Sequence, residues 1–255
     1  QQGKQYKSLR RIVPQNKKKK RLHDFNQKSF GKNIGRKRYF VYARKKNHCS
    51  GPQEDRVIRA FNNVRFYKSD MSGKCDSLHS NNKTQLTKMI GKPILWNNEN
   101  QMTGDIMHLI GNNKTQKLDS LKVLNNAFII QKDSLSKNGY NQIKGQNLYG
   151  KFVDSKLKEV DVVKNAEVIY YMYNDANEFI GINKTVCSKI NLELEENKIN
   201  SITFFTKTDS HIYPEADFPE NARKLRGFLW RGDERILSKD DIFPAEEIAL
   251  DDKIQ

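Results

Sequence analysis

The pentapeptide Asn-Asn-Lys-Thr-Gln occurs twice in this chain, at Asn81–Gln85 and again at Asn112–Gln116. A second pattern, which runs apolar, two polar, apolar, polar, apolar, begins at Leu118, Leu157 and Ile199. Its copies start 39 and 42 residues apart (118 to 157, and 157 to 199). Self-similarity at a nearly fixed period of this length is the signature of a repeat architecture, in which each unit contacts its neighbours. The sequence therefore predicts a repeat protein.

Each copy is predicted to be a strand, a tight turn and a second strand. A small residue opens the first strand 12 to 14 residues before the apolar pattern: Gly104, Gly145 and Cys187, with a looser early copy that opens at Gly73. A polar turn separates the two strands, because Asn and Asp tolerate the left-handed backbone angles that hairpins need. The predicted turns are Asn82-Lys83, Asn113-Lys114, Asp154-Ser155-Lys156 and Asn197-Lys198.

Apolar and polar residues alternate within these strands, with the period of two that β-strands show. The third and fifth positions after the opening residue hold Met107 and Leu109, Leu148 and Gly150, and Ile190 and Leu192, whereas the first copy departs with Asp76 before Leu78. Polar residues occupy the other parity: His108, Asn147, Lys189 and Asn191. The sequence thus predicts an all-β, solenoid-like fold whose sheet is apolar on one face and polar on the other. The pattern leaves open whether the apolar strip is a closed core or an open groove.

Composition suits a thin β-repeat protein, with 36% hydrophobic and 30% charged residues in a chain of 255. The longest apolar stretch, Val168–Tyr173, is far short of the roughly 18 residues of a membrane-spanning helix. The chain has no initiator Met and no signal-like segment, as expected of a mature or trimmed form.

The positive charge is concentrated at the N-terminus. Residues 1–50 hold 17 Lys/Arg against the single acid Asp24, whereas the rest of the chain is balanced. Residues 1–54 are therefore predicted to be a basic, aperiodic, disordered arm. Its run Lys17–Arg21 would attract a polyanion, so a polyanion contact through residues 1–50 is one expectation. A solvated arm without a dedicated partner is the alternative.

Catalysis has little support in the sequence. The five His residues lie far apart, and no nucleophile elbow, phosphate-binding loop or metal-ligand spacing is present. We therefore expect no enzyme activity, no cofactor and no metal. The cysteines Cys49, Cys75 and Cys187 are predicted to be isolated small hydrophobes. The Asn-Lys-Thr sequons at Asn82 and Asn113 coincide with predicted turns, which explains these asparagines without a glycan.

The chemistry of the chain changes after residue 213. Pro214 and Pro219 interrupt the strand pattern, and an aromatic and Arg-rich segment, 225–235, follows. We expect residues 214–255 to form a C-terminal cap and tail that covers the last repeat, with Phe228 and Trp230 packed against it. Residues 55–213 then form the β-repeat domain. Within it, Tyr170–Tyr173 is either an aromatic ligand surface or a strand covered on both faces.

Several blocks together resemble the OstA-like, LptA-type family of lipopolysaccharide-transport proteins, in particular its longer members. They are Gly73–Leu78, Gly91–Trp96, Met102–Ile106, Asn141–Gly145, Asn165-Ala166, Gly181–Lys184 and Leu225–Trp230. The resemblance covers roughly residues 55–245, and the order of the blocks is more specific than any single block. The basic arm departs from the family, which would continue its repeat upstream; a segment encoded in another reading frame is one explanation.

The resemblance implies a β-jellyroll, or folded-over sheet, located in the periplasm or cell envelope, with association with the outer membrane as one expectation. It implies lipopolysaccharide as the ligand, with lipid A acyl chains in a groove between two layers, and edge-to-edge joining with other transport proteins. The residues predicted to line the groove are Leu78, Met107, Leu109, Leu121, Val123, Leu148, Phe152, Val160, Val162, Ile190, Leu192, Ile202 and Phe204. The alternative is a structural or adhesive β-repeat protein with a closed core that binds protein or glycan partners.

Overall fold

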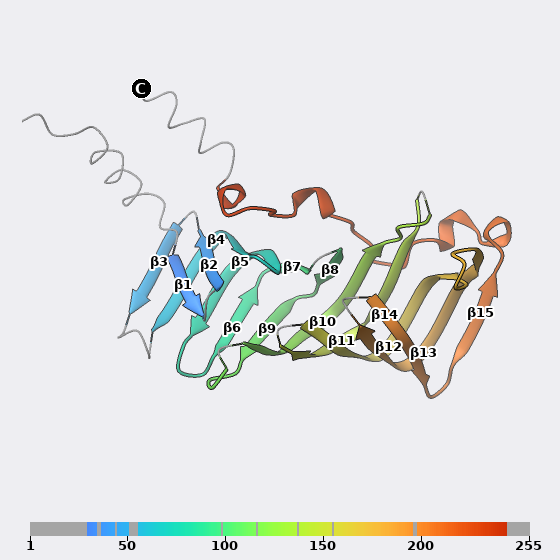
Figure 1. Cartoon of the computed structure of the whole chain (residues 1–255), viewed down its shortest axis with the longest axis horizontal. Coiled ribbons are helices and arrows are strands. Elements are labelled where there is room, and N and C mark those ends of the chain that lie inside the picture. The colour runs from blue at the N-terminus through green and yellow to red at the C-terminus, as the bar shows by residue number, and fades with distance from the viewer. Residues whose placement is uncertain are drawn as a thin grey trace, which may run out of the picture.

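The computed structural model describes residues 30–34, 37–43, 45–50, 56–97, 99–115, 117–136, 138–154, 156–195 and 198–243. Within these residues the chain is all-β, with one antiparallel sheet of 15 strands that extends along the long axis (Figure 1). The helices among them are short 3-10 turns, η2 (Glu215–Asp217), η3 (Glu220–Ala222), η4 (Gly232–Glu234) and η5 (Asp240–Ile242). The prediction of an all-β repeat fold is confirmed.

The strands follow one another in chain order across most of the sheet, as expected when consecutive strands are joined by hairpins. Their bounds are β1 Phe30–Ile34, β2 Lys37–Tyr42, β3 Lys45–Ser50, β4 Val57–Lys68, β5 Met71–Asn81, β6 Leu86–Ile90, β7 Ile94–Asn97, β8 Asn100–Thr103, β9 Ile106–Gly111, β10 Leu118–Lys132, β11 Tyr140–Val153, β12 Lys156–Tyr173, β13 Phe179–Glu195, β14 Lys198–Phe205 and β15 Asp209–Tyr213.

The repeated pentapeptide forms the same turn at both of its positions. The Oδ1 atom of Asn81 accepts hydrogen bonds from the backbone N–H groups of the second and third residues after it, at 2.8 and 3.3 Å. The Oδ1 atom of Asn112 accepts the same two bonds at 2.9 and 3.1 Å. An Asn side chain that bonds to its own backbone in this way closes a turn locally. The hairpins after β5 and β9 therefore lie where the sequence predicts them.

Pairs of adjacent residues with left-handed backbone angles fold the sheet over. These pairs are Asn62-Asn63, Gly91-Lys92, Asn125-Asn126, Lys164-Asn165 and Thr206-Lys207. The strand register shifts at three of them, between Phe61 and Val64, Leu124 and Ala127, and Val163 and Ala166, as a β-bulge requires. We call this line of bulges the corner. It divides the sheet into two layers whose inner faces share one apolar cluster.

The two layers are named by what covers their outer faces. The bare layer consists of β6, β9, β14 and the parts of the long strands that pair with them. The strapped layer consists of β7, β8, β15 and the remaining parts of the long strands. The fold is thus a jellyroll built from strand-turn-strand units.

Small residues at the corner have a steric cause. A Cβ atom on Gly104 would lie 2.3 Å from Cγ1 of Val123, and one on Gly145 would lie 2.5 Å from Cγ1 of Val162. The register corrects the alignment of the first copy, which opens at Cys75 rather than at Gly73. Cys75 pairs with Val64, the first residue after the bulge in β4. Gly145 and Cys187 likewise pair with the first residue after a bulge, in β10 and β12 respectively. Asp76 therefore lies opposite the bulge rather than in the apolar strip.

The structure differs from the prediction of a disordered arm over residues 30–50. These residues form β1, β2 and β3, and β2 and β3 both pair with β4. The continuous aromatic and apolar segment Tyr39–Tyr42 was an available signal, but the surrounding lysines and arginines obscured it. Residues 1–29 and 51–55, including the run Lys17–Arg21, lie outside the described residues.

The C-terminal segment is not a cap on the last repeat. Residues 214–243, which we call the strap, return along the outer face of the strapped layer toward β2 and β4 (Figure 1). Phe228 and Trp230 pack on Tyr140 of β11, with ring centroids at 5.2 and 5.5 Å. The prediction that these aromatics pack is confirmed, but their place is the side of the sheet rather than its end.

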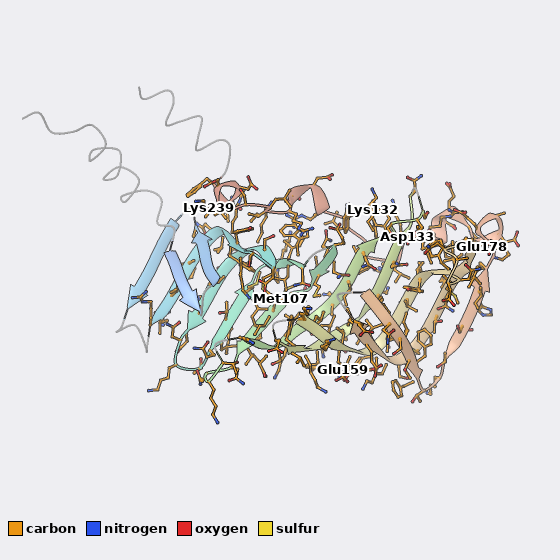
Figure 2. The ribbon with its side chains drawn as sticks, viewed as in Figure 1. Met107, Lys132, Asp133, Glu159, Glu178 and Lys239 are labelled. Carbon is orange, nitrogen blue, oxygen red and sulfur yellow. The ribbon has the colours of Figure 1, made fainter. Side chains whose placement is uncertain are left out.

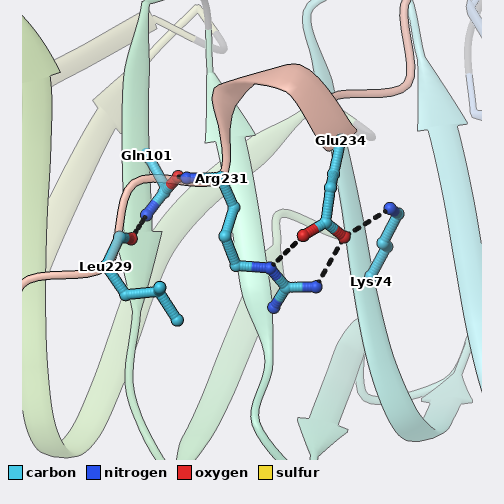
Figure 3. A network of polar contacts seen from close by, with 5 residues as sticks. All are labelled: Lys74, Gln101, Leu229, Arg231 and Glu234. Atoms are coloured by element: carbon cyan, nitrogen blue, oxygen red, sulfur yellow. Dashed lines mark hydrogen bonds and ion pairs between the residues drawn. The ribbon is translucent and has the colours of Figure 1, made fainter.

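Two buried glutamines hold the backbone of the strap. Gln101 Nε2 donates to the carbonyl of Leu229 at 2.6 Å, and its Oε1 accepts from the N–H of Arg231 at 2.7 Å (Figure 3). Gln142 repeats this arrangement one hairpin further along, with the carbonyl of Arg223 at 2.7 Å and the N–H of Leu225 at 2.8 Å. Each amide thus satisfies one donor and one acceptor of an extended chain.

An ion-pair network fixes the strap over β5. Glu234 accepts hydrogen bonds from Arg231 at 2.6 and 2.7 Å and from Lys74 Nζ at 2.9 Å (Figure 3). Arg231 is the main cause, with Lys74 a further one, that lowers the pKa of the Glu234 carboxyl from 4.5 to about 2. Burial lowers the pKa of Lys74, and the Glu234 carboxylate opposes that shift.

Candidate functional site

Two rows of inward-facing residues cross the bare layer from β4 to β14. Strand register places the members of each row directly opposite one another. The first row is Ala60, Leu78, Met89, Met107, Val123, Leu148, Val162, Ile190 and Phe204. The second row is Ile58, Ser80, Thr87, Leu109, Leu121, Gly150, Val160, Leu192 and Ile202. Side chains opposite each other in adjacent strands lie in contact range, so the first row is an unbroken apolar line.

All the residues predicted from the sequence to line a groove come together in one cluster. Leu78, Met107, Leu109, Leu121, Val123, Leu148, Phe152, Val160, Val162, Ile190 and Leu192 are buried, with at most 8% of each exposed. Ile202 and Phe204, on the last strand of the layer, are partly buried against the same cluster. Their ability to bind a lipid stays a prediction. Sequence reasoning missed Ala60, which precedes the first copy, and Met89, which lies in that loosely matching copy.

A third row faces the first two from the strapped layer. Its members are Phe66, Gly73, Leu95, Met102, Ile129, Ile143, Val168, Thr185 and Ser210. Sequence reasoning did not assign these residues to the strip. Segments such as Ala127–Ile130 are apolar on both faces, so their inward parity cannot be read from alternation.

Polar pairs end the apolar rows at opposite ends of the sheet. In the second row, Ser80 and Thr87 hydrogen bond to each other through their hydroxyls at 2.8 Å. In the third row, Thr185 bonds to Asn183 at 2.9 Å and to Ser210 at 2.7 Å. These bonds satisfy hydroxyls that would otherwise be costly next to an apolar interior. The second and third rows therefore each contain a polar pair near one end, whereas the first row is apolar from Ala60 to Phe204.

The strip is closely packed in this structure. Met107, at the centre of the sheet in Figure 2, is 0% exposed, as are Leu121, Val123 and Ile190. Two surface furrows of about 520 and 510 Å³ lie instead along the outside of the corner, lined by polar side chains that include Gln146, Asn165 and Glu167. The strip is thus a core in this state, and a ligand that bound there would have to displace this packing.

The outer face of the bare layer carries charged and polar side chains. Glu159 and Asp161 are joined to Lys151, Lys189 and Asn191 by contacts of 2.7 to 3.1 Å. The hydrogen bond from Lys151 is the main cause that lowers the pKa of Glu159. The predicted polar parity is confirmed at these strands.

His108 lies on the same outer face, opposite a lysine on each neighbouring strand. Burial and the positive charges of Lys88 and Lys122 lower the pKa of its imidazole below 6.5. The lysines explain the shift, so it does not indicate a catalytic histidine.

Cys75 and Cys187 are buried thiols. Burial raises the pKa of Cys75 to about 12 and also raises that of Cys187. Such thiols are unreactive, as predicted for small hydrophobes. The described part of the chain contains no group of three His, Cys, Asp or Glu side chains placed to hold a metal ion. No helix in these residues is long and apolar enough to span a membrane.

The aromatic segment Tyr170–Tyr173 is covered on both faces. Tyr170 packs on the inner cluster, whereas Tyr171 and Tyr173 pack under the strap. Tyr173 also donates a hydrogen bond to Asp133 at 2.5 Å. Of the two interpretations of this segment, a ligand surface or a strand covered on both faces, the second is therefore correct.

The last strands of the sheet have free edges and exposed apolar side chains. Among the residues that the structure describes, strands β14 and β15 each pair only with β13. Phe205 is 42% exposed and Ile212 is 57% exposed, with Val186 and Ile180 of β13 at 43% and 54%. An exposed edge with apolar side chains is a surface on which another sheet can pair.

These features define a class: an antiparallel β-jellyroll of strand-turn-strand repeats with a continuous apolar strip between its layers. A scan against protein-family models found no match, and a search of curated proteins found no significant match. Eight solved chains match the structure. One is the crystal structure of LptH, the LptA-homologous periplasmic component of the lipopolysaccharide transport device of Pseudomonas aeruginosa.

The match to LptH is 16% identical in sequence, covers 57% of this chain and 99% of LptH, and has a TM-score of 0.43. Similarity at this level does not establish a shared function. The fold assignment therefore rests on the strand pairing of this chain.

Proposed function

We propose that this chain binds the acyl chains of lipopolysaccharide between its two layers and passes the lipid along the periplasm toward the outer membrane without catalysis. The observation that carries the proposal is the unbroken apolar row from Ala60 to Phe204. The order of OstA-like sequence blocks supports the choice of lipid.

The energetics of the strip suit a sliding ligand. Burial of one CH₂ group is worth about 0.8 kcal/mol, so several acyl chains would be held firmly by similar side chains along the row. Since neighbouring positions of the row are nearly equivalent, displacement along it costs little. Transport along such a row requires no nucleophile or cofactor, but it does require partners that supply the work.

The free terminal edge supports joining with other transport proteins. The backbone groups on the outward side of β14 and β15 have no strand partner among the described residues. A second sheet that added to this edge would bury Phe205 and Ile212 and extend the apolar row across the junction.

Photocrosslinking tests the proposal directly. A photoreactive amino acid at Leu109, Val123 or Ile202 should form adducts with purified lipopolysaccharide. The residues immediately before the first two, His108 and Lys122, point to the outer face and serve as matched controls. Adducts confined to the inward positions support the proposal, whereas equal labelling of both faces, or none in the folded protein, rejects it.

The closed packing of the strip favours a second candidate, a structural or adhesive β-repeat protein. A core in which Val123 and Ile190 are 0% exposed is what a scaffold needs. This candidate predicts that a fluorescent fatty-acid probe is excluded, and that protein or glycan partners bind the outer face. A stoichiometric complex with the probe would reject it.

The basic N-terminal residues remain a predicted site of polyanion contact. Replacement of Lys17–Arg21 by glutamines should weaken binding to heparin, and the affinity of the unaltered chain should fall steeply with salt. Unchanged affinity in the variant would assign the contact elsewhere. Substitution is preferable to deletion of residues 1–50, because β1, β2 and β3 lie within that range.

A further inference from the structure

A row of amide side chains borders the apolar strip in the strapped layer. Asn97, Asn100, Gln131 and Asn141 lie directly opposite one another on the adjacent strands β7, β8, β10 and β11. We call these four residues the amide row. Their side chains lie in contact range of one another, since opposed positions have Cβ atoms about 4.5–5.5 Å apart.

The amide row faces the interior rather than the strap. Each member is two residues along its strand from an inward residue of the apolar cluster: Leu95, Met102, Ile129 and Ile143 respectively. Side chains two positions apart on a strand share a face. Asn97, Asn100 and Asn141 are only 4, 7 and 8% exposed. Amides therefore lie at the border of the apolar strip, on the side away from the corner.

The side chains of the row differ in the hydrogen bonds that they make. Asn97 donates to the carbonyl of Asp70 at 3.0 Å, and Asn141 accepts from the N–H of Tyr171 at 2.9 Å through Oδ1. No side-chain hydrogen bond joins Asn100 or Gln131 to any described residue. Buried amides are usually bonded, because an unmade bond costs about 1–3 kcal/mol. Asn100 and Gln131 thus offer N–H donors that no described residue accepts.

The chemistry of the row selects its ligand. An amide NH₂ donates to neutral carbonyl oxygens, whereas a carboxylate or phosphate is best met by a cation. Lys68, a buried cation at the end of β4, is paired with Asp70 at 3.1 Å. The ester and amide carbonyls that join acyl chains to a polar head lie where apolar chain gives way to polar group. The border of the strip is the corresponding place on this protein.

We infer that the amide row binds the carbonyl oxygens of the acyl linkages, so that the strip distinguishes acylated lipids from alkyl chains without a carbonyl. This inference rests on the proposed binding of acyl chains in the strip. It adds that the acyl carbonyls lie at the border formed by the amide row, and that hydrogen bonds to these carbonyls give the selectivity.

Paired probes test the inference with the full chain. A short-chain diacyl glycerophosphocholine and its dialkyl ether analogue share head group and chain length and differ in the two carbonyls. Calorimetric titration of both should show about fivefold tighter binding of the diacyl compound, as expected for one net hydrogen bond. In Asn100→Leu with Gln131→Met, near-isosteric apolar replacements, the ratio should fall to about one while the ether analogue still binds. Gln146→Leu, a similar loss of an amide at the corner, should keep the preference.

The outcomes separate this inference from the proposed function. If both probes bind the unaltered chain equally, the inference is overturned and lipid binding stands. A preference for the diacyl compound that persists in the double variant also overturns the inference, because another group must then bind the carbonyl. If neither probe binds, acyl-chain binding fails and the inference falls with it.

Discussion

The two layers of the sheet share strands but bury them differently. In β10, the part in the bare layer alternates between buried and exposed residues, as Leu121, Lys122 and Val123 show. Beyond the corner, the four residues Ala127–Ile130 are all buried. The difference arises because water covers the outer face of the bare layer, whereas the strap covers the outer face of the strapped layer.

The comparison shows that the pattern of apolar residues in a strand indicates which faces of the sheet are covered, and not only that the segment is a strand. An alternating segment reveals its inward face, and a continuous apolar segment reveals only that both faces are covered. The corner glycines and left-handed pairs lie where the alternating pattern of the bare layer changes to the continuous apolar pattern of the strapped layer. Four predictions test this difference between the layers, in order of decreasing effect.

Outer-face truncation should be costly only in the strapped layer. Ile130, which is 2% exposed, packs under the strap, so Ile130→Ala should lower the free energy of unfolding by about 2–5 kcal/mol. Tyr149 is 39% exposed on the outer face of the bare layer, and Tyr149→Ala should cost less than about 1 kcal/mol. Urea denaturation of both variants measures the contrast. Equal losses would mean that the strap does not shield its layer.

Loss of a glutamine clamp should release the strap. Gln142→Leu removes both hydrogen bonds of this side chain to the strap and leaves the carbonyl of Arg223 and the N–H of Leu225 without a partner, at a cost of about 1–3 kcal/mol. Hydrogen exchange in residues 223–231 should quicken, while exchange in β9 stays unchanged. Gln146→Leu serves as the control. Unchanged exchange in the strap would show that apolar packing alone holds it.

The Glu234 network should contribute less, and only above acidic pH. Glu234→Gln should cost about 0.5 kcal/mol, a value reduced for solvent because the carboxylate is 43% exposed. The folded pKa of about 2 lies below the ordinary 4.5, so this contribution is full above pH 4.5 and is lost as pH falls from 4.5 toward 2. Thermal unfolding of both proteins across this range should converge at low pH. A constant difference would exclude the ion pair as its source.

His108 should produce the smallest effect, a change in pH dependence at the bare layer. Its pKa is lowered below 6.5, so the unfolded chain binds the proton more readily and stability falls as pH drops below 6.5. His108→Gln should change stability by less than about 0.5 kcal/mol at pH 7 and should reduce the loss on acidification. Denaturation at pH 7.5 and 5.5 measures this, with Lys122→Gln expected to raise the pKa of His108. An unaltered slope in His108→Gln would assign the acid sensitivity to other groups.

Local sequence was enough to predict the repeat units and most of the inner strip. The Asn81 and Asn112 turns close through bonds to residues two and three positions away, so the pentapeptide contains everything they need. The inward residues of the bare layer follow from alternation, because water on one face forces the opposite parity to be polar. Met89 was missed because it lies in the first copy, which matches the other copies only loosely.

The strapped layer, the strap and the N-terminal strands depended on distant contacts. Lys74 and Glu234 are separated by 160 residues, and Gln101 and Arg231 by 130. No local pattern indicates that such residues meet, and a buried glutamine is as polar in sequence as an exposed one. The same holds for Asn100 and Gln131, which become a row only through strand register.

The sequence by itself thus determined the kind of protein, a β-repeat chain with an apolar and a polar face, because strand period and turn chemistry act over a few residues. Tertiary structure alone decided which faces are covered, where residues 214–243 pack and that the strip is closed. Those outcomes depend on how two layers and a returning segment share one apolar surface, and that surface exists only once the sheet has folded over at its corner.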